Sequence, residues 1–259
     1  MIANYHTHTW RCHHAKGTER EYVERAIEGG LKILGFSDHT PYPLPAGYHS
    51  PNRMEMDKMD GYVDTVLSLK KEYQADIEIH LGLETEYYPA YWEQLLDFLS
   101  DYPVEYMLLG QHYLGNEVDS NISSGQETSD GARLKQYVDQ CTEAMETGRF
   151  LYVAHPDLLN FTGDAEVFER EYRRLCRKAR ELDIPLEINM LGLWDHRPYP
   201  REDFWKIAGE EGCRAVIGCD AHLPENAWRP DIEQLAVEMA RRNHLTPEEW
   251  LPVGSMSLL

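Results

Sequence analysis

The sequence predicts an α/β fold in which parallel strands form one sheet with helices outside it. Short apolar runs rich in β-forming residues alternate with amphipathic stretches of helical length, so that seven βα units follow one another. The runs are almost continuously apolar, as in strands buried on both faces. A barrel or a doubly wound sheet therefore fits better than a β-sandwich. Neither GxGxxG nor GxxxxGK[ST] follows the first run, so a nucleotide-binding fold lacks its usual motif.

The element boundaries follow from where the apolar periodicity starts and stops. The expected strands lie at 2–6, 32–37, 77–83, 106–110, 150–154, 185–189 and 215–219. The expected helices run from Thr18 to Gly29-Gly30 and near 57–74, 91–100, 129–147, 164–183 and 201–211. Thr18 and Glu21 have the spacing of a capping box at the start of the first helix. Four prolines within residues 40–56 mark a long loop, and long loops in compact domains are often functional.

Composition and charge restrict the function. The 259 residues are 42% hydrophobic, which is enough for a sizeable core, and the formal net charge is −20. Such a field repels nucleic acid and anionic membranes, although bound metals can invert it locally and admit a phosphorylated substrate. The five cysteines include no CxxC pair, which argues against a disulfide framework or a structural zinc site. We see no signal peptide and no membrane-spanning apolar stretch, and therefore expect a cytoplasmic protein.

Polar side chains, mostly of metal-ligating types, end every expected strand. In chain order they are His6 and His8, Asp38 and His39, Glu84 and Glu86, His112, His155, Asn189, and Asp220 with His222. Because the carboxyl ends of barrel strands emerge on one face, we expect these side chains to converge there. Imidazoles and carboxylates without thiolates suit catalytic zinc, iron or manganese better than a closed structural site.

A single histidine at a strand end is more often a hydrogen-bonded residue than a metal ligand. Five strand ends that all supply histidine are much harder to assign to chance. His6 and His8 are two residues apart, so both side chains point the same way and can chelate one ion. The sequence therefore predicts a multinuclear metal site.

With these motifs the sequence resembles the polymerase and histidinol phosphatase (PHP) family. The matching segments are HTH at 6–8 with His14 six residues on, SDH at 37–39, GLE at 82–84, GQH at 110–112, AHP at 154–156 and CDAH at 219–222. The elements THTWRCHHAKG, EINMLGL followed by RPYP, and DAHLPE look most like the histidinol-phosphate phosphatase branch. The resemblance implies a distorted, TIM-like (βα)7 barrel, a single domain over residues 1–259, and three divalent ions (zinc, iron or manganese) at the strand ends.

The resemblance also implies which residues hold each ion. One ion would be held by His6, His8, Glu84 and Asp220, a second by Glu84 as a bridge with His112 and His155, and a third by His14, His39 and His222. All nine positions carry the expected residue type. The chain therefore does not resemble a degenerate, metal-free member of the family.

Other polar residues near these motifs are expected to stay off the metals. Glu86 shares a strand face with Glu84, but the family match favours Glu84 and leaves Glu86 as a supporting residue. Asp38 is expected to orient a neighbouring imidazole or to cap a helix. His13 is left out because adjacent residues rarely reach one ion, and Cys12 is expected to pack. The remaining histidines, of which His49 and His196 could touch substrate, are read as loop, core or surface residues: His49, His80, His196 and His244.

The expected reaction is hydrolysis of a phosphate monoester. Two metals bridged by a carboxylate typically lie about 3.5–4 Å apart and share a hydroxide, which would attack phosphorus in line. We expect Glu84, Asp220 and His222 to be the catalytic residues, with water, or Asp220 acting through it, as the source of the proton for the leaving alkoxide. Positioning and charge stabilisation dominate such reactions, so no nucleophilic serine or cysteine is required.

Substrate-binding residues are harder to read from sequence. Arg197, in the loop after the sixth strand, is the best candidate for a bidentate contact with phosphate. Arg11 and Tyr113 are lesser candidates. Glu86, Trp194 and the 40–56 loop are available for the amine and imidazole of a histidinol-like substrate, without an assignment.

Three functions are compatible with the sequence. The first is hydrolysis of L-histidinol phosphate to L-histidinol in histidine biosynthesis, a substrate that rests on the resemblance. The second keeps the same metals and acts on phosphodiesters, small nucleotides or other phosphate esters. The third is a metal-dependent binding module, which the complete ligand set disfavours. The net charge counts against long nucleic acids as partners, and the oligomeric state is left open.

Overall fold

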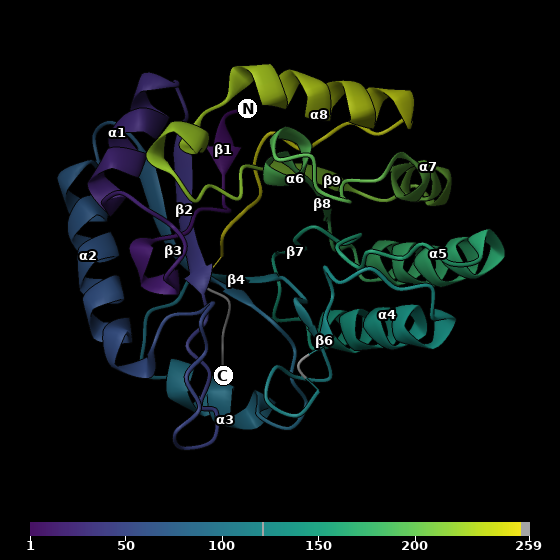
Figure 1. The fold of residues 1–259 in the computed structure, drawn as a ribbon. Helices are drawn as coiled ribbons and strands as arrows, with labels where there is room; N and C mark the ends of the chain where they lie inside the picture. Colours follow the sequence, from purple (N-terminus) through teal and green to yellow (C-terminus); the bar gives the residue numbers. More distant parts are fainter. Residues whose placement is uncertain (121, 255–259) are drawn as a thin grey trace.

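The computed structural model describes residues 1–120 and 122–254, in which parallel strands form one curved sheet surrounded by helices (Figure 1). The sheet has the order β1-β2-β3-β4-β7-β8-β9. Its strands are β1 (Ala3–Asn4), β2 (Ile33–His39), β3 (Glu78–Thr85), β4 (Tyr106–Leu109), β7 (Tyr152–Val153), β8 (Leu186–Asn189) and β9 (Ala215–Gly218). All of these pairings are parallel. The predicted seven-stranded, barrel-like α/β fold is confirmed.

The sheet nearly closes on itself where β1 meets β9. The amide of Ala221 donates to the carbonyl of His6 at 3.1 Å, and the amide of His8 donates to the carbonyl of Ala221 at 3.0 Å. At the ends of the two strands themselves, the amide of Cys219 donates to Asn4 Oδ1 at 3.0 Å. Because these bonds join the segments after the two strands, closure brings the first and last histidine motifs together.

The helices lie outside the sheet, as the amphipathic pattern predicts. Those close to the expected ranges are α1 (Glu19–Glu28), α2 (Met59–Glu72), α3 (Trp92–Leu99), α4 (Gly131–Glu146), α5 (Ala165–Glu181) and α7 (Glu202–Glu211). The capping box of Thr18 and Glu21 is present at the start of α1. None of the described helices is long and apolar enough to cross a membrane.

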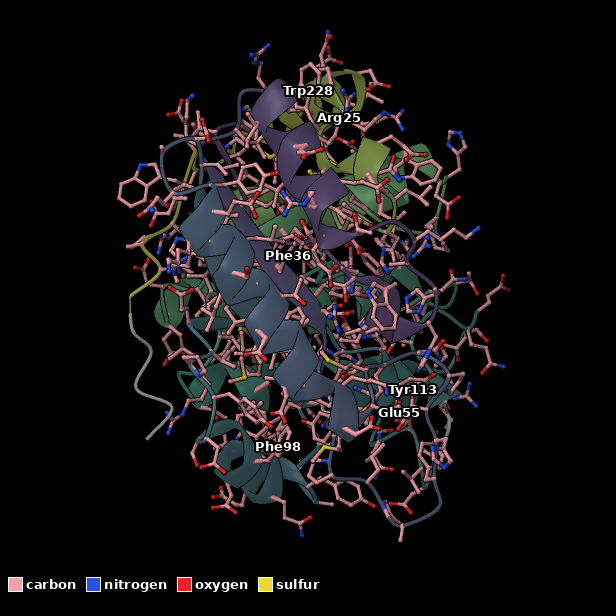
Figure 2. All side chains as sticks on the ribbon, turned by 90° about the vertical axis from the view of Figure 1, so that its left-hand side faces the viewer. Arg25, Phe36, Glu55, Phe98, Tyr113 and Trp228 are labelled. Atoms are coloured by element: carbon pink, nitrogen blue, oxygen red, sulfur yellow. The ribbon has the colours of Figure 1, made fainter. Side chains whose placement is uncertain are left out.

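Several elements escaped the sequence reading. They are α6 (Met190–Trp194), α8 (Pro230–Arg242), the antiparallel hairpin of β5 (Tyr113–Leu114) and β6 (Ile122–Ser123), and the short 3-10 turns η1 (Trp10–Cys12), η2 (Met56–Lys58) and η3 (Pro224–Ala227). α8 has a recognisable start, with Pro230 in its first turn, and buries Ile232, Ala236 and Met239 on one face. Just before it, Trp228 lies under Arg25 of α1, whose Cζ is 4.9 Å from the indole ring (Figure 2).

The interior of the barrel is filled by apolar and aromatic side chains. Tyr106 donates its hydroxyl to the carbonyls of Tyr5 and Phe36 at 2.7 and 3.0 Å. Its ring fits because residue 82 is glycine, where a Cβ would lie 2.3 Å from the Tyr106 ring. Leu251, near the end of the described chain, exchanges two hydrogen bonds with the Tyr5 hydroxyl. The polar strand ends therefore face a packed interior on one side and the loops on the other.

The expected long loop connects the end of β2 to η2 and packs beside the hairpin. Asn52 donates to the Tyr113 hydroxyl at 2.9 Å. Arg53 is buried and bonds to the carboxylates of Glu86 and Glu117. These contacts hold the loop over the carboxyl edge of the sheet.

Candidate metal centre

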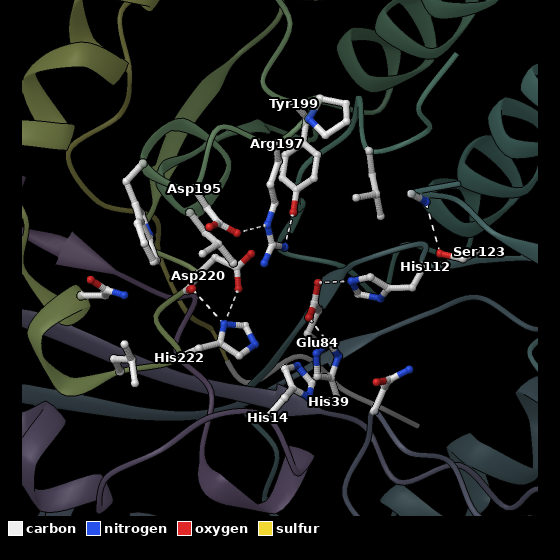
Figure 3. Close-up of a pocket in the computed structure, with 18 of the residues that line it drawn as sticks. His14, His39, Glu84, His112, Ser123, Asp195, Arg197, Tyr199, Asp220 and His222 are labelled. Atoms are coloured by element: carbon white, nitrogen blue, oxygen red, sulfur yellow. Dashed lines mark hydrogen bonds and ion pairs between the residues drawn. The ribbon is translucent and has the colours of Figure 1, made fainter. Parts of the chain in front are cut away.

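The expected ligand side chains converge at the carboxyl edge of the sheet (Figure 3). They come from the segments after β1 (His6, His8), the ends of β2 and β3 (His39, Glu84), the segments after β4, β7 and β9 (His112, His155, Asp220, His222) and the loop after η1 (His14). The structure thus brings together residues that are up to 216 positions apart, from 6 to 222. Barrel geometry accounts for this, because parallel strands all end on the same face.

Glu84 presents its two carboxylate oxygens to different histidines. Its Oε1 lies 2.8 Å from His155 Nε2 and 3.5 Å from His112 Nε2. Its Oε2 lies 3.4 Å from His8 Nε2 and 3.1 Å from His39 Nδ1. A carboxylate placed in this way can contact two ions at once, one through each oxygen.

Asp220 completes a compact set with Glu84 and the two histidines after β1. Asp220 Oδ1 lies 3.5 Å from His6 Nε2 and 3.1 Å from His8 Nε2. Glu84 Oε2 lies 3.6 and 3.4 Å from the same two nitrogens. Ligand atoms arranged tetrahedrally around zinc are about 3.4 Å apart, given metal–ligand distances of about 2.0–2.2 Å. We call these four residues the inner group.

The atoms of the inner group that face one another have no hydrogen-bond partner among the described residues. They are His6 Nε2, His8 Nε2, Glu84 Oε2 and Asp220 Oδ1, and all are buried. A buried polar atom without a partner costs about 1–3 kcal/mol. A cation coordinated by these atoms removes that cost, so the residues fit a divalent metal ion.

A second set, which we call the rim group, consists of His14, His39 and His222. Their candidate ligand atoms lie within 4.8 Å of one another, and all three side chains line the cavity above the cluster. His14 Nδ1 lies 2.7 Å from the carbonyl of Cys12, and His222 Nδ1 lies 3.1 Å from the carbonyl of Asp220. The Nε2 atoms of these two rings are therefore left to contact an ion.

The charges in the cluster match those of metal ligands. Burial raises the pKa of Glu84 and of Asp220, but the surrounding histidines outweigh it and hold both pKa values well below their usual range. Burial and the charge of His8 hold the pKa of His39 and of His222 well below that of a free imidazole. Both carboxyls are therefore ionised and both rings neutral, which are the forms that bind metals.

The two histidines after β1 have the opposite shift. Burial lowers the pKa of His6, but Glu187, Asp220 and Glu84 raise it well above its usual value. The pKa of His8 is likewise lowered by burial and raised more strongly by Asp220 and other neighbours. An ion that binds to the inner group therefore has to displace protons from these rings.

Local backbone geometry also shapes the cluster. His155 and Asp220 adopt φ values of +30° and +49°, in the left-handed region that non-glycine residues seldom occupy. Such conformations cost about 1–3 kcal/mol and persist where the surroundings impose them. Residue 110 is a glycine beside Glu84, where a Cβ would lie 2.0 Å from Glu84 Oε1. The GQH motif thus carries a glycine that makes room for the carboxylate.

Two further carboxylates lie beside the expected ligands. Glu86 bonds to Arg53 through both oxygens and lies 3.1 Å from His112 Nδ1, on the far side of the ring from Glu84. Asp38 Oδ1 lies 3.5 Å from His8 Nδ1. Glu86 therefore orients the His112 imidazole from behind, a common arrangement at metal sites, whereas Asp38 places a negative charge near His8.

Glu187, in β8, was not singled out by the sequence reading. It is fully buried, and its Oε1 lies 2.7 Å from His6 Nδ1. The signal was present, because a charged residue interrupts the apolar run PLEIN two positions before Asn189. Two residues along a strand return to the same face, so Glu187 and Asn189 point to the same side of the sheet.

Comparisons with known proteins agree with this geometry. A family model for the PHP domain matches residues 4–191, well over half of the chain. The chain belongs to the PHP domain family. The resemblance inferred from the motifs is thus confirmed, although the CDAH motif at 219–222 lies beyond the matched segment.

Relatives of this PHP chain span most of its length. A Deinococcus radiodurans protein named "Probable histidinol-phosphatase" is 28% identical over 230 residues, which cover 86% of this chain and 87% of that protein. A Schizosaccharomyces pombe protein of the same name is 25% identical and covers 86% and 81%. The structure of histidinol phosphate phosphatase from Lactococcus lactis, complexed with zinc, L-histidinol and phosphate, superposes with a TM-score of 0.69 at 19% identity, covering 94% of this chain and 92% of that one. This last likeness shows that the fold is shared.

A cavity of about 660 Å³ opens over the cluster of expected ligands in this PHP chain, lined among others by the rim group, Glu84 and Asp220. Arg197 points into it from above (Figure 3). Its Nε donates to Asp195 Oδ2 at 2.9 Å and its Nη1 to the Tyr199 hydroxyl at 2.9 Å. These bonds hold the guanidinium in place over the cluster.

Of the other two expected substrate contacts, one reaches the cavity and one does not. Tyr113 lines the cavity with its half-buried ring. Arg11 does not line it, because its guanidinium is drawn to the buried carboxylate of Glu19 and donates to the carbonyl of Gly61 at 3.0 Å. The expectation that Arg11 contacts substrate is therefore wrong: the neighbouring acidic helix attracts it away from the site.

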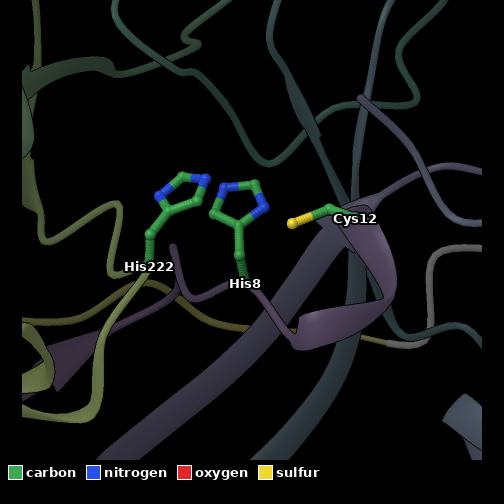
Figure 4. A group of neighbouring side chains, drawn as sticks. All are labelled: His8, Cys12 and His222. Atoms are coloured by element: carbon green, nitrogen blue, oxygen red, sulfur yellow. The ribbon is translucent and has the colours of Figure 1, made fainter. Parts of the chain in front are cut away.

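Cys12 lies beside the cluster, in a group with His8 and His222. Figure 4 shows its sulfur next to His8, with His222 on the other side of that ring. The thiol donates to the carbonyl of Thr9 at 3.1 Å, and burial raises its pKa. Cys12, which the sequence predicts to be a packing residue, is buried there, and its sulfur lies within 4.8 Å of candidate ligand atoms of His8 and His222.

The remaining histidines lie away from the cluster. His13 is exposed and has a left-handed backbone conformation. His80, on β3, lies between the carboxylates of Glu78 and Glu105. His49, His196 and His244 are surface residues that do not line the cavity.

Proposed function

We propose that this protein is a metal-dependent phosphomonoesterase that hydrolyses L-histidinol phosphate to L-histidinol and phosphate. The observation that carries the chemistry is the two-sided Glu84 carboxylate among buried, unpartnered ligand atoms at the base of an open cavity. The substrate is supported by relatives named for histidinol-phosphatase activity, which match this chain over most of its length.

Three divalent ions would occupy the cluster, and zinc, iron or manganese all suit its N and O ligands. The inner group would hold one, His112 and His155 together with Glu84 would hold a second, and the rim group would hold a third. When bound, such ions supply an activated water and neutralise the charge of the phosphate. Glu84, Asp220 and His222 are the residues closest to this chemistry.

The chain's own residues then bind and orient the ester. Arg197 donates to the nonbridging phosphate oxygens, since its guanidinium is already held over the cluster by Asp195 and Tyr199. Tyr113 also lines the cavity. The proton for the leaving alkoxide would come from water, or from Asp220 acting through it.

The location and the partners that we propose for the enzyme follow from its cysteines and its net charge. All five cysteines are buried free thiols, which suits the reducing cytoplasm. The partner is a small phosphorylated molecule rather than nucleic acid or membrane, because the net charge of −20 repels polyanions. We assign residues 1–259 to a single metallohydrolase domain, of which residues 121 and 255–259 lie outside the described part.

The test is a substrate panel assayed on protein purified with its native metals. Phosphate release from L-histidinol phosphate is compared with release from aryl phosphates, nucleoside monophosphates and diesters, while the metal content is measured in parallel. We expect kcat/KM to be highest for L-histidinol phosphate. Turnover of that ester no faster than of a generic aryl phosphate would overturn the substrate, and preferential cleavage of a diester would favour the phosphodiesterase reading.

A further inference from the structure

β8 is the strand of the described seven-stranded sheet whose carboxyl end supplies none of the expected metal ligands. The ends of the other six supply histidine, glutamate or aspartate to the cluster. β8 instead ends in Glu187 and Asn189, both fully shielded from solvent. A charged residue buried inside a barrel is costly unless its contacts compensate for the lost hydration.

Glu187 has such contacts on both carboxylate oxygens. Oε1 lies 2.7 Å from His6 Nδ1 and accepts from the Tyr152 hydroxyl at 3.2 Å. Oε2 accepts from the backbone amide of His155 at 3.0 Å and from Asn189 Nδ2 at 2.9 Å. One side chain thus touches two ligand residues that come from different strands.

Asn189 extends these contacts to a third ligand. Its Nδ2 also donates to Asp220 Oδ2 at 3.1 Å, while Oδ1 of Asp220 faces the inner group. Its own Oδ1 accepts from the amide of Gly192 at 2.9 Å, at the start of α6. The amide side chain is therefore fixed at both ends, so its orientation is determined.

The contacts of Glu187 and Asn189 reach two expected ligands whose backbone conformation is unfavourable. His155 and Asp220 have left-handed backbones, and it is the amide of His155 and the side chain of Asp220 that this pair holds. Space for Glu187 is provided by Gly218 on β9, where a Cβ would lie 1.8 Å from Glu187 Oε1. The neighbouring strand thus leaves room for this carboxylate, as Gly110 does for Glu84.

We propose that Glu187 and Asn189 form a positioning pair that orients His6, His155 and Asp220 for metal binding. Glu187 keeps the proton of the His6 ring on Nδ1, which leaves the Nε2 lone pair facing the inner group. Asn189 turns Asp220 so that one oxygen is held and the other is free. The inference rests on the proposed metal centre, but it concerns residues that are not ligands themselves.

The main test is the Glu187→Gln variant, which keeps the size of the side chain. Glutamine has one acceptor and one donor group, so it cannot accept hydrogen bonds from both His6 and the His155 amide. Zn²⁺ affinity is measured by competition with a chromophoric chelator on metal-free protein. We expect the ions that depend on His6 and His155 to bind about 10- to 100-fold more weakly, while the ion of the rim group keeps its affinity.

A matched control is Glu171→Gln, which alters a buried glutamate on α5 that pairs with Arg170 and Arg174. This variant should bind Zn²⁺ as the parent does. A double variant of Glu187→Gln with His6→Ala adds a test of mechanism. If Glu187 acts through the His6 ring, the double variant loses little more affinity than His6→Ala alone.

The outcomes separate the two proposals. Parental Zn²⁺ affinity in Glu187→Gln, or equal weakening of all sites together with a lower Tm of the metal-free protein, would overturn the positioning role. A parent protein that binds none of Zn²⁺, Fe²⁺ and Mn²⁺ would overturn the proposed function as well. If Glu187→Gln does not fold, Asn189→Ala replaces it, with weaker binding at the Asp220 site expected and parental binding contradicting the proposal.

Discussion

The inner and rim groups of the cluster are built in different ways. In the inner group, buried imidazoles are backed by carboxylates: Glu187 behind His6 and Asp38 behind His8. In the rim group, His14 is backed by the backbone carbonyl of Cys12, and His222 Nδ1 faces both the carbonyl of Asp220 at 3.1 Å and Asp220 Oδ1 at 3.3 Å. A carboxylate strengthens a ligand more than a carbonyl does, because it stabilises positive charge on the ring.

The difference indicates which part of the site is rigid and which part can exchange its metal ion. His6 and His8 are completely buried, whereas His14 is exposed on a loop. We therefore expect tight binding at the inner group and easier loss of the rim ion. Four substitutions test this difference, in order of decreasing effect.

Glu84→Gln should have the largest effect, because the two carboxylate oxygens of Glu84 face different histidines of the cluster. We expect kcat/KM to fall at least about a thousandfold, equivalent to about 4 kcal/mol of lost transition-state stabilisation. Steady-state kinetics and metal analysis measure the change, with Glu171→Gln as the control. Retention of a full metal complement and activity would show that Glu84 is not the shared residue.

His14→Ala should affect the rim group alone. We expect one ion per chain to be lost, or bound roughly 10- to 100-fold more weakly, while the inner group keeps its ions. Metal analysis after gel filtration with a mild chelator measures the stoichiometry. His13→Ala is the matched control, since His13 is adjacent and exposed but does not line the cavity. Equal losses in both variants would contradict the distinct role of His14.

Arg197→Lys keeps the positive charge over both groups but removes the planar fork. We expect kcat/KM to fall about tenfold, or about 1.4 kcal/mol, with metal content unchanged. Kinetics with L-histidinol phosphate check this value. An unchanged kcat/KM would mean that the guanidinium does not contact the phosphate.

Glu105→Gln should have the smallest effect, because Glu105 pairs with His80 where no metal is expected. Burial raises the pKa of Glu105, but His80, Lys70 and the Leu81 amide lower it to about 2 from the usual 4.5. A lowered pKa stabilises the fold above the unfolded-state pKa, and this contribution is lost as pH falls from about 4.5 toward 2.

We expect Glu105→Gln to lower the free energy of unfolding by about 1 kcal/mol at neutral pH, since the group is half exposed. Urea unfolding at pH 7 and at pH values from about 4.5 toward 2 measures how this difference shrinks, and metal content should stay parental. A loss of metal would show that a carboxylate–histidine pair outside the cluster also affects metal binding. The contrast between the inner and rim groups would then be weaker.

Much of the site could be predicted because local patterns carry it. Strand periodicity places His6 and His8 on one side of the chain, and parallel strands bring all carboxyl ends to one face. Arg11 shows the limit of such reasoning. Its position beside the motif suggested substrate, but its buried partner Glu19 lies eight residues on, and only packing reveals that pairing.

The sequence by itself determined the fold class, the strands whose ends carry ligands and the family to which the chain belongs. These depend on periodicity, motif order and residue type, which are local. The tertiary structure alone decided which oxygen of Glu84 meets which histidine, that β8 supports ligands rather than supplying one, and that Ala221 closes the barrel against His6 and His8. Those contacts join strands distant in the chain, and strand order and register set their distances.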